Sequence, residues 1–129
     1  MAGGIGSRFW PISRTDFPKQ FLDILNTGRT LIQATYDRFA KFIPAENIYV
    51  VTFEQYKDIV ALQLPQLPVE NILCEPSRKN TAPCVAYISY KLHQLNENAN
   101  LICAPSDHLI SDEIGFEKIC TQALQFTDN

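Results

Sequence analysis

Short runs of mainly apolar residues alternate along the chain with segments in which apolar residues recur every three or four positions. The runs at residues 48–52, 72–75 and 101–104 are typical of strands in a parallel sheet covered on both faces. The segments between and after them have the period of amphipathic helices. This alternation predicts an α/β domain with a mostly parallel sheet flanked by helices.

The first two predicted helices begin with capping signals. Residues 30–33 have the sequence of a capping box, Thr-Leu-Ile-Gln, and residues 52–55 open the second helix in the same manner. Tyr56 and Val60 are expected to face inward from the second helix. The apolar face of the first helix carries Ile32, Tyr36, Phe39 and Ile43.

Two more helices are predicted further along the chain. The third covers residues 81–95, with Pro83 tolerated in its first turn. The fourth covers about residues 112–126 and has a clear apolar stripe, which is expected to pack on the rest of the domain. The stripe consists of Phe116, Ile119, Cys120, Ala123 and Leu124.

The start of the chain differs from the usual pattern of such domains. A glycine-rich turn normally follows a buried strand, but only Met1 and Ala2 precede Gly3. The last predicted helix runs to the end of the sequence. We therefore expect residues 1–129 to be part of one domain that is incomplete at both ends.

Composition and charge narrow the function classes. Hydrophobic residues make up 46% and charged residues 19%, which is typical of a globular protein and argues against disorder. No apolar stretch is long enough for a membrane helix, and the net charge of −3 argues against nucleic-acid binding. The first 41 residues nevertheless carry a net charge of +3. This basic segment predicts a local anion site.

The four cysteines predict a reducing compartment. Cys74, Cys84, Cys103 and Cys120 form no C-x-x-C pair, and each lies in an apolar run. We therefore expect buried, reduced thiols and a cytoplasmic protein, with neither zinc nor a disulfide framework.

The glycine-rich start has the residue types of a phosphate site. Gly3, Gly4 and Gly6 allow backbone N–H groups to approach an anion, and Ser7 and Arg8 follow directly. Arg8 is a multi-donor ligand for phosphate. A glycine cluster by itself fits a structural turn equally well.

Four segments together point to a known family. The order Gly-Gly-x-Gly-Ser-Arg-x-Trp-Pro at residues 3–11 is followed by Pro-Lys-Gln-Phe-Leu at 18–22. Residues 75–83 then read Glu-Pro-Ser-Arg-Lys-Asn-Thr-Ala-Pro, and residues 105–108 read Pro-Ser-Asp-His. The chain resembles the sugar-1-phosphate nucleotidyltransferases, and among them the mannose-1-phosphate guanylyltransferases. One departure is Lys79, which stands at the family's Arg position directly after Arg78.

The resemblance implies a function for the whole protein. It implies formation of GDP-mannose and pyrophosphate from GTP and mannose 1-phosphate, by a Rossmann-like, GT-A-like half-domain of which this chain is the N-terminal nucleotide-binding part. It allows a homodimer for the complete protein. The family's sugar-recognition residues and a second metal-binding carboxylate follow beyond the matched region. We therefore expect the isolated chain to bind nucleotide weakly and to catalyse no measurable transfer.

The catalytic residues implied are Arg8, Lys19 and Asp107. Arg8 and Lys19 supply positive charge for phosphates, and Asp107 follows the third predicted strand, where open α/β sheets bind ligands. Its carboxylate suits Mg²⁺, the expected cofactor. The nucleotide-binding residues implied are Ala2, Gly3, Gly4, Gly6, Ser7, Arg8, Lys19, Asn80, Thr81, Pro105, Ser106 and Asp107.

Three assignments remain open at the level of sequence. Asn80 and Thr81 border the guanine base by resemblance, and at least one of them is also expected to cap the third helix. His108 either orients Asp107, contacts ligand or is structural. For the whole protein, the alternatives are a related nucleotidyltransferase with another base or sugar, and a non-catalytic nucleotide-sensing subunit.

Overall fold

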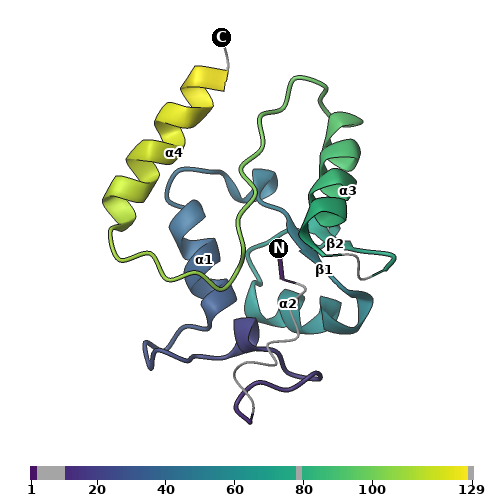
Figure 1. Cartoon of the computed structure of the whole chain (residues 1–129), viewed down its shortest axis with the longest axis vertical. Helices are drawn as coiled ribbons and strands as arrows, with labels where there is room; N and C mark the ends of the chain where they lie inside the picture. The colour runs from purple at the N-terminus through teal and green to yellow at the C-terminus, as the bar shows by residue number, and fades with distance from the viewer. Residues whose placement is uncertain (3–10, 78–79, 128–129) are drawn as a thin grey trace.

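The computed structural model describes residues 1–2, 11–77 and 80–127 (Figure 1). Gly3, Gly4, Gly6, Ser7 and Arg8 therefore lie outside the described residues, as do Arg78 and Lys79. The helices and strands are, in chain order, α1 (Leu31–Phe39), β1 (Val50–Thr52), α2 (Lys57–Gln63), β2 (Ile72–Cys74), α3 (Thr81–His93) and α4 (Glu113–Thr127).

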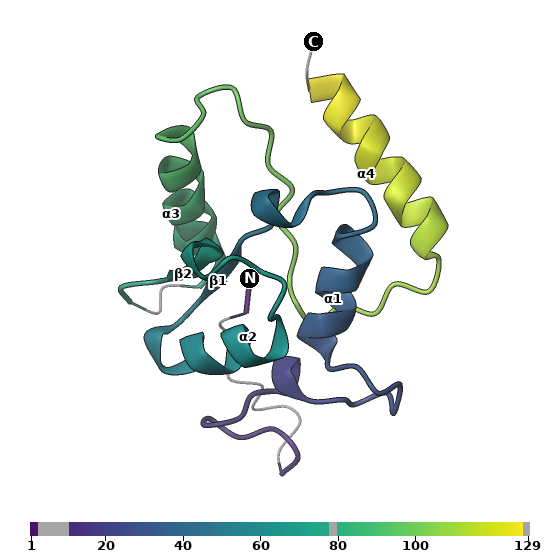
Figure 2. The same ribbon diagram turned by 180° about the vertical axis from the view of Figure 1, so that it is seen from behind.

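A parallel sheet lies at the centre of the chain, as predicted. β1 and β2 pair with Val50 opposite Ile72, Val51 opposite Leu73 and Thr52 opposite Cys74. Side chains of a strand alternate between the two faces of a sheet. One face, with Val50 and Ile72, packs in a core with α1 and α2, and the other, with Val51, packs against α3. The result is a sheet between two helical layers (Figures 1 and 2).

Met1 and Ala2 lie beside β1 in the middle of the molecule (Figures 1 and 2). The Ala2 nitrogen donates to the Val51 carbonyl at 2.8 Å. On the other side, the Met1 nitrogen donates to the Ala104 carbonyl at 2.9 Å, and the Ser106 nitrogen donates to the Met1 carbonyl at 3.2 Å. These bonds place residues 104–106 next to Met1, at the edge away from β2.

The prediction of a third strand at residues 101–104 is wrong. This segment has no regular secondary structure, although it runs alongside the sheet region between α3 and α4 (Figure 1). The backbone bonds between Met1 and residues 104–106 are too few to form a ladder of several residues. Leu101 and Cys103 are accordingly exposed.

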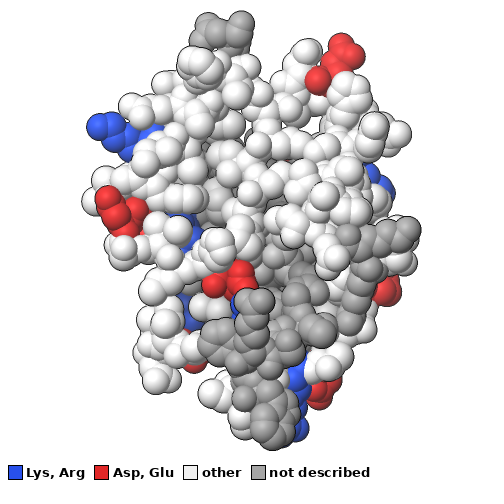
Figure 3. All heavy atoms as spheres, viewed as in Figure 1, with Lys and Arg blue, Asp and Glu red and all other residues white. Residues whose placement is uncertain are grey.

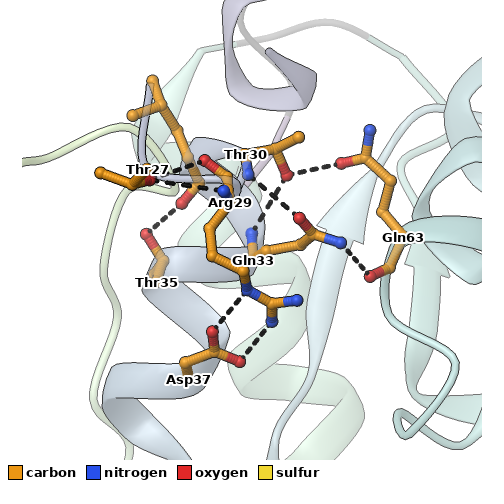
Figure 4. Close-up of polar contacts among 8 residues, drawn as sticks. Thr27, Arg29, Thr30, Gln33, Thr35, Asp37 and Gln63 are labelled. Carbon is orange, nitrogen blue, oxygen red and sulfur yellow. Dashed lines mark hydrogen bonds and ion pairs between the residues drawn. The ribbon is translucent and has the colours of Figure 1, made fainter. Parts of the chain in front are cut away.

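The start of α1 follows the sequence prediction. The Thr30 hydroxyl accepts from the Gln33 nitrogen, and the Gln33 side chain accepts from the Thr30 nitrogen, which completes the capping box. Gln63, at the end of α2, accepts a bond from the Thr30 hydroxyl at 2.8 Å (Figure 4). Arg29 forms two hydrogen bonds with Asp37 on the same side of α1. On the predicted apolar face, Ile32, Tyr36 and Phe39 are buried, whereas Ile43 lies beyond the end of the helix.

The capping box predicted at residues 52–55 does not form. Thr52 is the last residue of β1, and a 3₁₀ turn at Glu54–Tyr56 precedes α2. The Thr52 hydroxyl donates instead to the Ala2 carbonyl at 3.2 Å. Tyr56 and Val60 are buried, as predicted.

α4 packs less closely than its apolar stripe predicts. Ile119 is 67% exposed and Ala123 is also exposed, while Phe116, Cys120 and Leu124 are half-buried. Phe116 packs edge-on against Phe39 of α1 at 5.5 Å between ring centroids. Glu113 joins α4 to α1 through ion pairs with Lys41 at 2.6 Å and with buried Arg38 at 3.6 Å.

A largely apolar hollow of ≈ 550 Å³ lies between α1, β1, α3 and the segment after α3. Its lining includes Tyr36, Phe39, Ile88, Leu92 and Leu124, and no lining residue among those described carries a charged side chain. Charged side chains lie mainly around the margin of the face drawn in Figure 3, with uncharged ones over its upper middle. No helix within the described ranges is both long and apolar enough to span a bilayer.

Candidate active site

Two of the predicted catalytic residues meet in the structure. The Lys19 ammonium forms an ion pair with the Asp107 carboxylate, although 88 positions separate the two residues in the chain. Their side chains are 25% and 23% exposed, so the pair is accessible to a ligand. A positive and a negative group at one accessible point are able to contact a phosphate and a cation, respectively.

Lys19 is held by the buried residues on both sides of it. It begins the 3₁₀ turn Lys19–Phe21, in which Phe21 donates to the Pro18 carbonyl and Leu22 to the Lys19 carbonyl. Pro18 and Phe21 are buried, and the Phe21 ring packs against Tyr56 at 5.7 Å between centroids. A short turn with buried neighbours leaves the long Lys19 side chain at the surface, where it reaches Asp107.

Asp107 directly follows the segment that lies beside Met1. Ser106 is buried, and its backbone bond to Met1 fixes the point at which the chain leaves the sheet region. Ala2 is held in the same region, because its nitrogen donates to the Val51 carbonyl of β1. Ala2, Pro105, Ser106, Asp107 and Lys19 are thus brought together at one edge. Sequence reasoning predicted ligand residues at this edge because the carboxyl ends of parallel strands share it.

Comparison with known proteins decides the family. The sequence model of the nucleotidyl transferase family matches residues 1–128. The chain belongs to the nucleotidyl transferase family. It is 39% identical over 132 aligned residues to a mannose-1-phosphate guanylyltransferase of Escherichia coli (strain K12), with 99% of this chain and 27% of that protein covered. It is 41% identical to the mannose-1-phosphate guanylyltransferase of Salmonella montevideo, with the same coverage.

A solved structure agrees with the fold of this nucleotidyl transferase chain. The present chain is similar to a crystal structure of mannose-1-phosphate geranyltransferase from Thermus thermophilus, with a TM-score of 0.79 and 33% sequence identity. That similarity covers 97% of this chain and 36% of the solved one. The chain thus spans about a quarter to a third of the length of these relatives.

The segment expected to border the base lies at the start of α3. Asn80 and Thr81 are both exposed, and Asn80 occupies the N-cap position with φ of 66°. The Asn80 side chain makes no capping hydrogen bond, so the expected capping role does not apply to it. A positive φ is uncommon for a residue other than glycine, and asparagine is among those that adopt it most readily. His108 is exposed, and its carbonyl accepts a bond from Arg38 at 3.5 Å.

Two buried polar residues beside this site were not predicted from the sequence to belong to it. Gln20 is 2% exposed and Thr52 is 0% exposed, and both side chains donate to the Ala2 carbonyl. Gln20 lies within the Pro-Lys-Gln-Phe motif, but its partner is 18 positions away. The sequence signal for Gln20 was its position between Lys19, a predicted catalytic residue, and Phe21, a residue of the core.

Three of the four cysteines are poor candidates for a nucleophile. All four are free, as predicted, but only Cys84 is buried. Cys74 and Cys120 are half-buried, and Cys103 is exposed because its segment forms no strand. Burial and the nearby Glu75 raise the pKa of the buried Cys84 thiol to about 11. Burial also raises the pKa of Cys74 and of Cys120. A thiol with a raised pKa holds its proton at neutral pH and is a poor nucleophile.

Proposed function

We propose that the complete protein containing this chain transfers the guanylyl group of GTP to mannose 1-phosphate, giving GDP-mannose and pyrophosphate. The observation that carries the proposal is the contact between Lys19 and Asp107, which joins two motifs at one accessible edge. The names of the relatives support the choice of GTP and mannose 1-phosphate.

The reaction requires positioning and charge stabilisation rather than a covalent enzyme intermediate. An oxygen of the sugar phosphate attacks the α-phosphorus of GTP in line, the bond to the bridging oxygen breaks, and pyrophosphate leaves with that oxygen. Lys19 binds and polarises phosphate oxygens in this scheme, together with Arg8. Donors of this kind stabilise the charge that develops in the transition state.

The donor set at Asp107 fits Mg²⁺ that arrives with the nucleotide. No group of three or more metal-ligating side chains occurs within the described part of the chain. Mg²⁺ commonly binds through one or two carboxylates together with substrate phosphates and water, so a single carboxylate is sufficient on the protein side. When bound there, the ion would neutralise charge on the phosphate oxygens.

The remaining proposed contacts surround this point. The backbone of Ala2, Gly3, Gly4, Gly6 and Ser7 is proposed to bind the triphosphate, with Pro105 and Ser106 beside it. Asn80 and Thr81 are proposed to contact the edge of the guanine base, because an amide and a hydroxyl pair well with a purine. The reduced thiols fit a cytoplasmic enzyme.

The test is GDP-mannose synthesis by the complete protein and its Lys19→Ala variant. We expect kcat/KM to fall about 10²-fold or more, as for loss of one transition-state donor. Lys91→Ala removes a lysine from α3, away from the site, and should leave the rate unchanged. An unchanged rate in Lys19→Ala would contradict the proposed role of this residue.

A second assay separates the alternatives. GTP, UTP, TTP and ATP compete in one reaction with mannose 1-phosphate, and the sugar nucleotides formed are quantified. A predominance of GDP-mannose supports the proposal. Preference for another base identifies a related nucleotidyltransferase, and the absence of any product indicates a nucleotide-sensing protein.

A further inference from the structure

Three buried polar groups converge beside the candidate active site. The Ala2 carbonyl accepts from the Gln20 side-chain nitrogen at 2.9 Å and from the Thr52 hydroxyl at 3.2 Å. All three residues are at most 2% exposed. A long polar side chain is rarely buried to this extent, and burial is unfavourable unless its hydrogen bonds are made.

The Gln20 bond belongs to a closed ring of contacts. Three pairs of residues adjacent in the sequence take part in it: Lys19 with Gln20, Met1 with Ala2, and Ser106 with Asp107. The ring is closed by the bond from Gln20 to Ala2, by the bond from Ser106 to Met1, and by the ion pair of Lys19 with Asp107. It runs through Lys19, Gln20, Ala2, Met1, Ser106 and Asp107. Gln20 thereby connects the lysine to the backbone that holds the aspartate.

We propose that Gln20, assisted by Thr52, is a positioning residue that sets the place of Lys19 relative to Asp107 and to Ala2. This inference rests on the proposed function. A 3₁₀ turn of three residues has little stability of its own, so the position of Lys19 depends on what anchors the turn. Misplacement of a catalytic group by about 1 Å is enough to slow a reaction about 10²-fold.

Two near-isosteric variants remove the donors and keep the volume. Gln20→Met retains the length of the side chain but has no N–H group, and Thr52→Val lacks the hydroxyl. A matched control is Asn71→Leu, because Asn71 is also a buried amide that donates to two carbonyls, those of Glu46 and Ile48. Ile48 precedes β1 and Asn71 precedes β2, so this amide lies at the opposite end of the strands from the ring.

The complete protein is assayed for GDP-mannose synthesis with each variant alone and in the Lys19→Ala background. We expect Gln20→Met to lower kcat about tenfold or more, with a smaller change in the KM for GTP, because misplacement acts on the transition state. We expect no further loss when Gln20→Met is added to Lys19→Ala, since the two residues act as a unit. Thr52→Val should follow the same pattern with a smaller loss.

The control separates positioning from general loss of stability. Asn71→Leu is expected to reduce the resistance to urea as much as Gln20→Met does and to leave kcat unchanged. If Gln20→Met does not fold, Thr52→Val tests the inference instead, through its loss of kcat with and without Lys19. An unchanged kcat in the folded variants, or equal losses with and without Lys19, overturns the inference and leaves the proposed function intact. Full activity in Lys19→Ala instead contradicts the proposed role of Lys19, and the absence of GDP-mannose synthesis by the unaltered complete protein removes the proposed function itself.

Discussion

At the scale of single residues, the ion pair of Lys19 with Asp107 has a consequence for ligand binding. The Lys19 ammonium is paired with the Asp107 carboxylate, which is the group proposed to contact Mg²⁺. Both side chains are partly exposed. A cation can reach Asp107 only in competition with Lys19, whereas a triphosphate offers the ammonium a new partner. Nucleotide and cation should therefore bind more strongly together than separately.

A charge-removing variant tests this competition. We predict that Lys19→Met raises the affinity of the nucleotide-free protein for Mg²⁺ about two- to fivefold, the range expected from losing a partly exposed ion pair. The same variant should weaken GTP binding, because a phosphate ligand is lost. Titration of backbone amide NMR signals near Asp107 with Mg²⁺ measures the first effect. Lys91→Met is the control, and an unchanged or lower Mg²⁺ affinity in Lys19→Met would show that the two cations do not compete.

Sequence reasoning found this pair but not the residues that support it. Asp107 and Lys19 were each named from a motif of the resemblance, Pro-Ser-Asp-His and Pro-Lys-Gln-Phe-Leu, whereas the strand predicted before Asp107 does not form. Gln20 and Thr52 acquire their role only through the Ala2 carbonyl, 18 and 50 positions away. A hydrogen bond between distant positions leaves no periodic pattern in a single sequence, and such contacts become visible only in the folded chain.

At the scale of elements, local signals held only where no distant partner competed with them. The capping box at Thr30 formed, with both of its hydrogen bonds between Thr30 and Gln33. The same pattern at Thr52 failed because the hydroxyl has a partner across the sheet. Residues 101–104 have the composition of a strand, but a strand exists only when a neighbour supplies a full row of hydrogen bonds. At Thr52 and at residues 101–104, contacts with distant parts of the chain therefore decided the local structure, rather than the local sequence.

The junction of α1 and α4 predicts a pH-dependent contribution to stability. The hydrogen bond from Lys41, together with the charges of Lys41 and Arg38, lowers the pKa of Glu113 below its ordinary value of 4.5. A carboxylate with a lowered pKa in the folded state stabilises the fold above its ordinary value, and this stabilisation is lost as the pH falls through the lowered value. Glu113→Gln should therefore be less stable than the native sequence at neutral pH and equally stable in acid.

Urea unfolding at about pH 7 and at about pH 3 measures this difference. The loss at neutral pH is expected to be small, up to about 1 kcal/mol, because the Glu113 side chain is 39% exposed and screened by solvent. Glu117→Gln removes a carboxylate from the same helix without affecting the pairs with Lys41 and Arg38. A loss that persists in acid, or one equal to that of Glu117→Gln, would show that the ion pairs do not hold the two helices together.

At the scale of the whole molecule, the candidate site and the apolar hollow adjoin at Met1 and Ser106, but they differ in chemistry. Lys19 and Asp107 meet at one edge of the sheet region and do not line the hollow of ≈ 550 Å³, whose lining within the described part of the chain has no charged side chain. A triphosphate needs donors and cations, so the hollow does not suit it. The apolar hollow is therefore not the proposed binding point for the triphosphate.

The last prediction concerns residues 1–129 produced alone. The described part of the candidate site offers a single carboxylate for a metal, and several large apolar side chains are exposed, among them Ile114, Ile119 and Phe126 of α4. We expect calorimetry to show weaker binding of Mg²⁺-GTP than the complete protein shows, and a coupled pyrophosphate assay to detect no transfer to mannose 1-phosphate. The exposed apolar groups should also bind a hydrophobic dye more strongly than the complete protein does. Robust GDP-mannose synthesis by the 129 residues would show that one carboxylate and these contacts suffice for the whole reaction.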